Sequence, residues 1–391
     1  MSVDHRIRVR QAGVTIGTMP TGPENAITDV PGVAVGHVTL VAGEGPLVPG
    51  CGPVRTGVTA VVPHRGNLFR RKAPGAVHVI NGFGKAAGLA QIAELGSIET
   101  PILLTNTLNV GTVWDAVVTE MIRQNPEIGI GPVGTVNPVV GECNDGFLND
   151  IQGRHVQAEH VRQALASASP GPVAEGAIGA GTGMSCYGFK GGIGTSSRAL
   201  GAEMGGFLVG VLVQANFGRR EDLLVAGVPV GRELKDWEPP AAAPAAKQDH
   251  SSSGGWGPEQ FALDSGSVMV ILGTNAPVSS RQLGRLARRA GLGLARTGSI
   301  AGHGSGDFVI AFGLPAPEES PPEVPSYATT RIPEDGRLLG ALFQATIEAT
   351  EEAVLNALFG AATMVGRDGH VRYGLPINLT LDILRRYGRV S

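Results

Sequence analysis

Short runs of apolar and β-branched residues recur along the chain, each bounded by glycine, proline, asparagine or aspartate. Runs of this kind between turn residues are typical of buried strands. The pattern predicts strands at Gly57–Val62, Ala76–Ile80, Pro101–Leu104, Phe207–Val213, Val268–Leu272 and Phe308–Leu314.

Other segments carry apolar residues at helical spacing, most clearly Arg337–Leu358. Ser279 and Ser280 precede a basic segment and are suited to cap a helix there. Further helices are predicted at Lys85–Leu95, Thr112–Arg123, Arg281–Ala290 and Asn378–Tyr387. Because strands and helices mix without strict alternation, the order favours a layered α+β sandwich over a doubly wound sheet.

The sharpest change of composition is Glu238–Gly257, which is rich in proline, alanine, serine and glycine. Such a segment buries little apolar surface, so we predict a flexible linker at residues 238–257. Soon after it comes Gly266-Ser267, which leads directly into the apolar run Val268–Leu272.

Composition excludes several classes of protein. The 391 residues are 42% hydrophobic and 17% charged, which suits a globular protein with a sizeable core. A net charge of −3 gives no sign of a nucleic-acid surface. The apolar runs are well short of the ~20 residues that a membrane span needs, so no membrane partner is expected.

Cysteine usage and metal motifs add two expectations. The three cysteines, Cys51, Cys143 and Cys186, are odd in number and widely spaced, which fits a reducing, cytoplasmic location better than a disulfide framework. The first residues lack the apolar stretch of a secretory signal. No His or Cys spacing indicates a metal ligand set, so neither metal nor cofactor is expected.

Gly266-Ser267 has the chemistry of a self-cleaving junction. A serine hydroxyl there can attack the preceding carbonyl, and the small Gly266 does not obstruct that attack. Cleavage would leave Ser267 with a free α-amine, whose ordinary pKa of about 7.7–8.0 lets it act as a base on its own hydroxyl. Taken alone, the dipeptide is better interpreted as an ordinary loop that enters a strand, and the other segments of the chain change that interpretation.

Three other segments hold polar groups at strand ends. Asn216 follows an apolar strand, where its amide could bind a developing oxyanion or satisfy a turn. Ser305 and Asp307 are two residues apart, so on an extended backbone they point to one face. The glycine-rich Gly181–Thr195 matches neither phosphate-binding nor dinucleotide fingerprints, and is better interpreted as a wall of close backbone approach.

Two polar segments are weaker candidates for a substrate pocket. Asn144 and Phe147 lie in a turn-rich stretch, and Asn109 and Trp114 lie where a helix is predicted to begin. Each could line a pocket or simply serve a turn or a helix cap.

In their order along the chain, these segments resemble the family of self-processing L-aminopeptidase/D-esterases and β-peptidyl aminopeptidases. The resemblance runs from Ile27-Thr28-Asp29-Val30 to Asn356-Ala357-Leu358. Its most specific pieces are Gly191-Gly192-Ile193-Gly194-Thr195-Ser196-Ser197-Arg198, Val213-Gln214-Ala215-Asn216, Gly266-Ser267, Arg296-Thr297-Gly298-Ser299 and Gly304-Ser305-Gly306-Asp307.

The resemblance implies a fold and a maturation step. The fold is a single domain over residues 1–391, a four-layer αββα sandwich that resembles N-terminal-nucleophile hydrolases with different connectivity. The maturation step is self-cleavage into a large chain, 1–266, and a small chain, 267–391. Assembly as a homotetramer of processed heterodimers is also implied.

By the same resemblance, Ser267 is the nucleophile and Asn216 binds the oxyanion. Ser305 and Asp307 position the catalytic amine and the substrate's amino group. The family also uses a tyrosine near the oxyanion, in a region aligned with Asn144–Asn149. This chain has Phe147 there and no tyrosine, so Asn144 is the substitute donor if the alignment holds.

The sequence therefore predicts a serine aminopeptidase or amidase that removes N-terminal residues from small peptides, amides or esters with a free amino group. Two alternatives stay open. One is an acyltransferase of the ornithine acetyltransferase type, whose threonine nucleophile differs from Ser267. The other is a non-catalytic small-molecule-binding protein.

Overall fold

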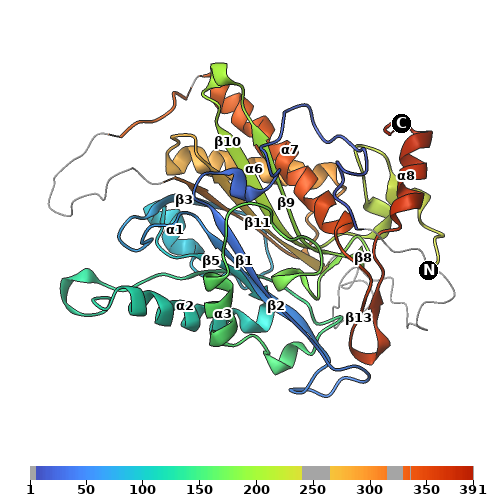
Figure 1. The fold of residues 1–391 in the computed structure, drawn as a ribbon, viewed down its shortest axis with the longest axis horizontal. Coiled ribbons are helices and arrows are strands. Elements are labelled where there is room, and N and C mark those ends of the chain that lie inside the picture. The colour runs from blue at the N-terminus through green and yellow to red at the C-terminus, as the bar shows by residue number, and fades with distance from the viewer. Residues whose placement is uncertain (1–5, 240–264, 315–328, 335, 391) are drawn as a thin grey trace.

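Two β-sheets form the centre of the molecule (Figure 1). The computed structural model describes residues 6–239, 265–314, 329–334 and 336–390. The four-stranded sheet has the order β1 (Ala34–Ala42), β2 (Val54–Val62), β5 (Ile102–Asn106), β6 (Val139–Cys143). The six-stranded sheet has the order β4 (Ser97–Ile98), β3 (Ala73–Gly82), β12 (Gly304–Gly313), β11 (Ser265–Thr274), β10 (Leu208–Asn216), β9 (Gly192–Ala199).

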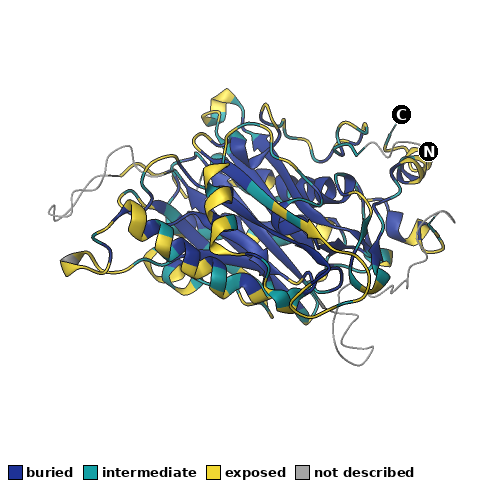
Figure 2. Ribbon diagram, turned by 60° about the horizontal axis from the view of Figure 1, so that its bottom comes forward, coloured by how far each residue is buried: buried dark blue, intermediate teal, exposed yellow. Residues whose placement is uncertain are grey.

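Helices cover the outer face of each sheet. The helices α2 (Val110–Gln124) and α3 (Ala158–Ala166) pack on the four-stranded sheet. The long helices α6 (Ser280–Arg296) and α7 (Arg337–Phe359) pack on the six-stranded sheet. Most of both sheets is buried, although β1 and β3 are partly exposed toward their C-terminal ends, and many exposed residues lie on the outer helix faces and loops (Figure 2).

Shorter elements complete the described chain. They are the helices α1 (Leu89–Leu95), α4 (Val230–Glu233) and α8 (Ile377–Arg386), and the hairpins β7 (Ser185–Cys186) with β8 (Phe189–Lys190) and β13 (Met364–Val365) with β14 (Val371–Arg372). Single turns of 3-10 helix lie at Ile27–Asp29, Thr107–Asn109, Gly131–Val133, Ile151–Gly153, Gly179–Gly181, Ala202–Met204, Arg220–Asp222 and Arg367–Gly369.

Strand alternation divides the core into three apolar layers. Leu104 of β5 faces Met269 and Ile271 of β11 between the two sheets. The opposite face of β11 presents Val268 and Val270 to α6 and α7. A third layer lies between the four-stranded sheet and α2 and α3. The result is the αββα layering that the sequence predicted.

The predicted elements are present, with some differences in bounds. Ser279 caps α6, where its hydroxyl accepts from the Gln282 N–H at 3.2 Å. The helix predicted from Lys85 begins only at Leu89, because Gly88 before it has a left-handed φ of 86°. The predicted linker, from residue 240 onward, lies outside the described residues.

Sequence pattern missed β1, β6, β9 and α3. β9, Gly192–Ala199, is the clearest case because Thr195, Ser196, Ser197 and Arg198 are all buried. A strand this polar lacks the apolar signal of a buried one. It is stable inside the protein because other segments supply hydrogen-bond partners for each polar group.

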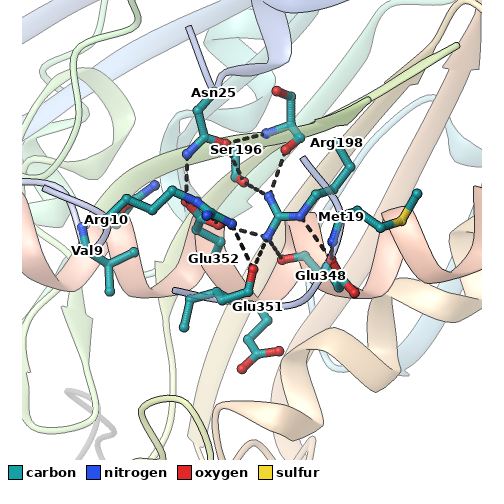
Figure 3. Close-up of polar contacts among 12 residues, drawn as sticks. Val9, Arg10, Met19, Asn25, Ser196, Arg198, Glu348, Glu351 and Glu352 are labelled. Carbon is teal, nitrogen blue, oxygen red and sulfur yellow. Dashed lines mark hydrogen bonds and ion pairs between the residues drawn. The ribbon is translucent and has the colours of Figure 1, made fainter. Parts of the chain in front are cut away.

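Arg198 is the centre of those contacts (Figure 3). It is fully buried, and its guanidinium pairs with Glu352 of α7 at 2.7 Å and with Glu348 at 3.2 Å. Glu352 also accepts from Arg10 at 2.8 Å and from the Asn25 amide at 2.6 Å. The network therefore fastens the N-terminal segment and β9 to α7.

We predict that Arg198→Met destabilises the protein by about 3–5 kcal/mol, because it leaves two buried carboxylates short of a cation. A denaturant titration measures this as a loss in the free energy of unfolding. The matched control is Arg162→Met, which breaks an ion pair with the exposed Glu159 and should leave the free energy of unfolding nearly unchanged. Equal losses in the two variants would contradict the prediction.

Candidate active site

Ser267 lies near the start of β11, where three strands of the six-stranded sheet run side by side. The antiparallel ladder pairs it with Asn216, the last residue of β10. The parallel ladder pairs it with Gly306 of β12. These backbone hydrogen bonds set the three strands at one level, and only 5% of Ser267 is exposed.

The Asn216 side chain is held in one orientation. Its Oδ1 accepts a hydrogen bond from the Ser185 N–H at 2.8 Å, so its Nδ2 is the donor end. Nδ2 donates to the Asn144 carbonyl at 3.0 Å and to the Ser267 Oγ at 3.3 Å. An N–H donor is therefore fixed beside the serine hydroxyl, as an oxyanion-binding group requires.

Ser305 and Asp307 form the second polar pair. The Ser305 hydroxyl donates to Asp307 Oδ1 at 2.6 Å, and Asp307 Oδ2 is buried without a hydrogen-bond partner in the described chain. The Asn81 amide holds the Ser305 carbonyl at 2.6 Å. Burial raises the pKa of Asp307 to about 6, and the Ser305 hydrogen bond opposes that rise.

The ladder register places these two groups on opposite faces of the sheet. Ser267 shares its face with Asn216 and, two residues along, with Met269, which faces the other sheet. Asp307 pairs with Val268, whose side chain faces the helix layer. The part of Ser267 that lies between the two faces is its backbone nitrogen.

Gly266 is tightly surrounded at the predicted junction. A Cβ on Gly266 would lie 3.1 Å from the Ser305 Oγ and 3.1 Å from the Phe217 Cβ. The Ser305 hydroxyl is therefore beside the backbone that precedes Ser267. A larger residue at position 266 would have to displace the Ser305 hydroxyl.

Two site residues escaped sequence reasoning, Glu142 and Cys143 at the end of β6. Cys143 is buried beside Ser267, and burial raises its pKa well above the usual value, with the Glu142 charge adding to the effect. Glu142 is 3% exposed and accepts hydrogen bonds from the Lys85 N–H at 2.9 Å and from the Thr107 hydroxyl. The signal available was the run Val139–Cys143 that ends at an Asn-Asp-Gly turn.

The four predicted pocket residues lie in different surroundings. Asn144 is exposed, and its Oδ1 accepts from the Gly146 N–H at 2.8 Å while its carbonyl contacts Asn216. Phe147 is buried and stacks on His370 with ring centroids 4.6 Å apart.

Asn109 and Trp114 lie on the N-terminal side of α2. Asn109 is fully buried, and its Nδ2 donates to the Val156 carbonyl at 2.8 Å. Trp114 is partly exposed on the helix surface. Of the four, only Asn144 contacts the residues around Ser267, through its carbonyl, which accepts from the Asn216 amide.

The described residues form neither a metal-binding cluster nor a membrane-spanning helix. Among the residues with described positions, no three His, Cys, Asp or Glu side chains group so as to hold a metal ion. No helix in the described ranges has the length and apolar character to cross a membrane.

Known proteins resemble this chain in both sequence and fold. The profile of peptidase family S58 matches residues 25–372. The beta-peptidyl aminopeptidase BapA of Sphingosinicella microcystinivorans is 41% identical over 384 residues, which span 98% of this chain and 93% of that protein.

Solved structures agree. A protein of Pyrococcus horikoshii OT3 superposes with a TM-score of 0.88 at 47% identity, over 98% of this chain and 100% of that one. The L-aminopeptidase D-Ala-esterase/amidase of Ochrobactrum anthropi, described as a prototype serine aminopeptidase and a new variant of the Ntn-hydrolase fold, gives 0.84 at 36% identity, over 98% and 99%.

The raised pKa of Asp307 predicts a pH-dependent stability. The carboxyl ionises near 3.8 when unfolded but near 6 when folded, so the folded protein holds an extra proton between these values. That stabilisation is complete below the unfolded pKa and is lost as the pH rises through 6. Since Asp307→Asn cannot ionise, adding it to the uncleaved Ser267→Ala protein should raise the free energy of unfolding, relative to Ser267→Ala alone, by about 2–3 kcal/mol more at pH 7 than at pH 4.

Urea titrations across this range provide the measurement. Asp368→Asn is a control of opposite sign, because the Leu47 N–H lowers the pKa of Asp368. That variant should lose stability relative to wild type as the pH rises. A pH-independent difference for Asp307→Asn would show that this carboxyl ionises normally.

Proposed function

Since the chain belongs to peptidase family S58, we propose that it matures by cleaving its own Gly266–Ser267 bond and then works with Ser267 as an N-terminal nucleophile. The chain is a hydrolase of the aminopeptidase class, related in fold to Ntn hydrolases, which confirms the family and fold class predicted from its motifs. The observation that carries the proposal is the Asn216 amide 3.3 Å from the Ser267 hydroxyl, at the predicted junction.

Maturation begins with attack by the Ser267 Oγ on the Gly266 carbonyl carbon. The C–N bond breaks, the amide becomes an ester, and the nitrogen takes the proton that the hydroxyl loses. Water then hydrolyses the ester and frees residues 1–266 from 267–391. The tight space around Gly266, where a Cβ would contact Ser305 and Phe217, supports the need for glycine here.

Turnover uses the amine that maturation creates. The Ser267 α-amine takes the hydroxyl proton as the oxygen attacks the substrate carbonyl, and returns it to the leaving amine. Asn216 Nδ2 donates to the oxyanion, a contact worth about 2.7–4 kcal/mol in comparable sites. Water then hydrolyses the ester between the acyl group and Ser267, which releases the carboxylic acid and restores the free hydroxyl.

The Ser305–Asp307 pair acts on the Ser267 amine in this proposal. By register both side chains lie on the face opposite the hydroxyl, and the Ser305 hydroxyl is beside the Gly266 backbone, whose peptide bond to Ser267 contains the nitrogen that would become the amine. Above about pH 6 the Asp307 carboxylate is charged and can orient an ammonium group.

If Asp307 orients the Ser267 amine, a different carboxylate must bind the substrate's amino group. Sequence motifs had assigned this task to Asp307 as well, but its position on the opposite face argues for Glu142. Glu142 is buried at the end of β6, and its charge acts on the thiol of Cys143, which is buried beside Ser267.

The substrate class follows from the relatives. We propose small peptides or amides with a free N-terminal amino group, β-aminoacyl compounds included, because a relative that covers 98% of the chain is a beta-peptidyl aminopeptidase. The serine at 267 and the family match disfavour the acyltransferase alternative. We also propose a homotetramer, for which the exposed apolar Phe83 and Ile300 would supply contact area, and a cytoplasmic location.

Ser267→Ala should abolish maturation, because the attacking oxygen is gone. Wild type should give two bands on a denaturing gel, and N-terminal sequencing of the smaller one should begin Ser-Val-Met-Val. Ser299→Ala, a serine substitution elsewhere in the chain, should cleave like wild type. Cleavage of Ser267→Ala at the same bond would contradict the proposal.

Removal of the two carboxylate charges should have separable effects. Glu142→Gln should raise KM for free-amine peptides, whereas Asp307→Asn should mainly lower kcat. Each loss in kcat/KM should be roughly tenfold to a hundredfold, as expected for one hydrogen bond to a charged group. Steady-state kinetics with free and N-acetylated peptides test this, and equal turnover of the two peptides by wild type would contradict amine recognition.

A further inference from the structure

Lys190 is a fully buried lysine that is linked to Asn216, the proposed oxyanion-binding residue, through one peptide unit. Lys190 is 0% exposed and ends the hairpin formed by β7 and β8. Its ammonium group donates to three backbone carbonyls, those of Gly181 at 3.0 Å, Met184 at 2.9 Å and Gly191 at 2.7 Å. An ammonium has three N–H groups, so its hydrogen-bonding capacity is fully used.

One of these carbonyls belongs to the peptide unit that orients Asn216. The Met184 carbonyl and the Ser185 N–H are the two ends of a single peptide bond. Its carbonyl is held by Lys190 and by the Gly191 N–H at 3.0 Å, and its N–H donates to Asn216 Oδ1 at 2.8 Å. Because the peptide unit is planar, fixing the direction of its carbonyl fixes the direction of its N–H.

The rest of the hairpin is also tied to the segment that carries Asn216. Tyr187 and Gly188 both have left-handed φ values, 51° and 70°, as a tight two-residue hairpin turn requires. The Tyr187 N–H donates to the carbonyl of Phe217, the residue after Asn216, at 2.8 Å. Arg372 Nε donates to the Ser185 hydroxyl at 2.9 Å.

We propose that Lys190 is a positioning residue for the reaction of Ser267, acting through the Met184–Ser185 peptide to hold the Asn216 amide with its Nδ2 toward the nucleophile. This rests on the proposed roles of Ser267 and Asn216. Lys190 cannot touch the substrate, since it is fully enclosed. Loss of its ammonium frees the peptide to rotate and lets the Asn216 amide turn away.

A double-mutant cycle tests the proposal, with Lys190→Met, Asn216→Ala and the two combined. The rate of precursor cleavage is read on gels, and kcat and KM are measured on protein whose cleavage is complete. Lys190→Met should lower the cleavage rate and kcat about tenfold to a hundredfold, with KM changed less than about twofold, because an oxyanion donor acts in the transition state. In the Asn216→Ala background the same substitution should change the rates less than about twofold.

Two further variants sharpen the result. Lys190→Gln keeps two N–H donors without a charge, so its kcat should fall between those of wild type and Lys190→Met. Lys190→Gln also replaces Lys190→Met in the double-mutant cycle if Lys190→Met fails to fold. Tyr187→Phe removes the hydroxyl that meets Thr297 at 2.8 Å at the far end of the hairpin, and should lower stability while kcat stays near wild type.

The outcomes distinguish failure of the Lys190 positioning role from failure of the Asn216 oxyanion role. If Lys190→Met slows both reactions equally in the wild-type and Asn216→Ala backgrounds, its effect does not pass through Asn216 and the positioning role is wrong. An unchanged kcat in Lys190→Met would also contradict the positioning role. If Asn216→Ala alone slows neither reaction, the oxyanion role in the proposed function fails instead.

Discussion

The hydrogen-bond register of β10, β11 and β12 is the constraint on which the site depends. It sets Ser267 level with Asn216 on one side and Gly306 on the other. A shift of one residue would turn Ser267 toward the helix layer and away from Asn216, because side chains alternate across a strand. The apolar alternation opposes such a shift, because Val268 and Val270 are buried against the helices and Met269 is buried between the sheets.

The same alternation gives one residue access to two chemical environments. The hydroxyl of Ser267 faces the donor amide of Asn216, and the Ser305 hydroxyl, which donates to Asp307, lies beside the Gly266 backbone that leads into Ser267. In the proposed mechanism, Ser267 is both nucleophile and base, and it needs this division. The strand supplies it because a backbone nitrogen lies in the plane of the sheet, whereas the side chain points out of it.

Buried polar contacts hold the surroundings of the site in place. The Arg198 network fastens β9 to α7, and β9 pairs with β10 up to Ala215, next to Asn216. The hairpin of Ser185 and Lys190 supports Asn216 from the other side. Groups of this kind are stable inside a protein only when their partners are complete, so they restrict the conformations available to the site.

By itself, the sequence determined the layered α+β class, most of the strands and helices, and the family, because apolar periodicity and short motifs are local properties. It also identified Ser267, Asn216, Ser305 and Asp307 as chemically suited residues. It could not reveal β9 or the end of β6, whose buried polar residues are satisfied by segments far away in the chain. Only the tertiary structure decided that Cys143 lies beside Ser267, that the Asn109 side chain binds the Val156 carbonyl, and that Asp307 lies across the strand from the hydroxyl. These facts depend on strand register and on the packing of the two sheets, which arise between segments distant in sequence and leave no local pattern.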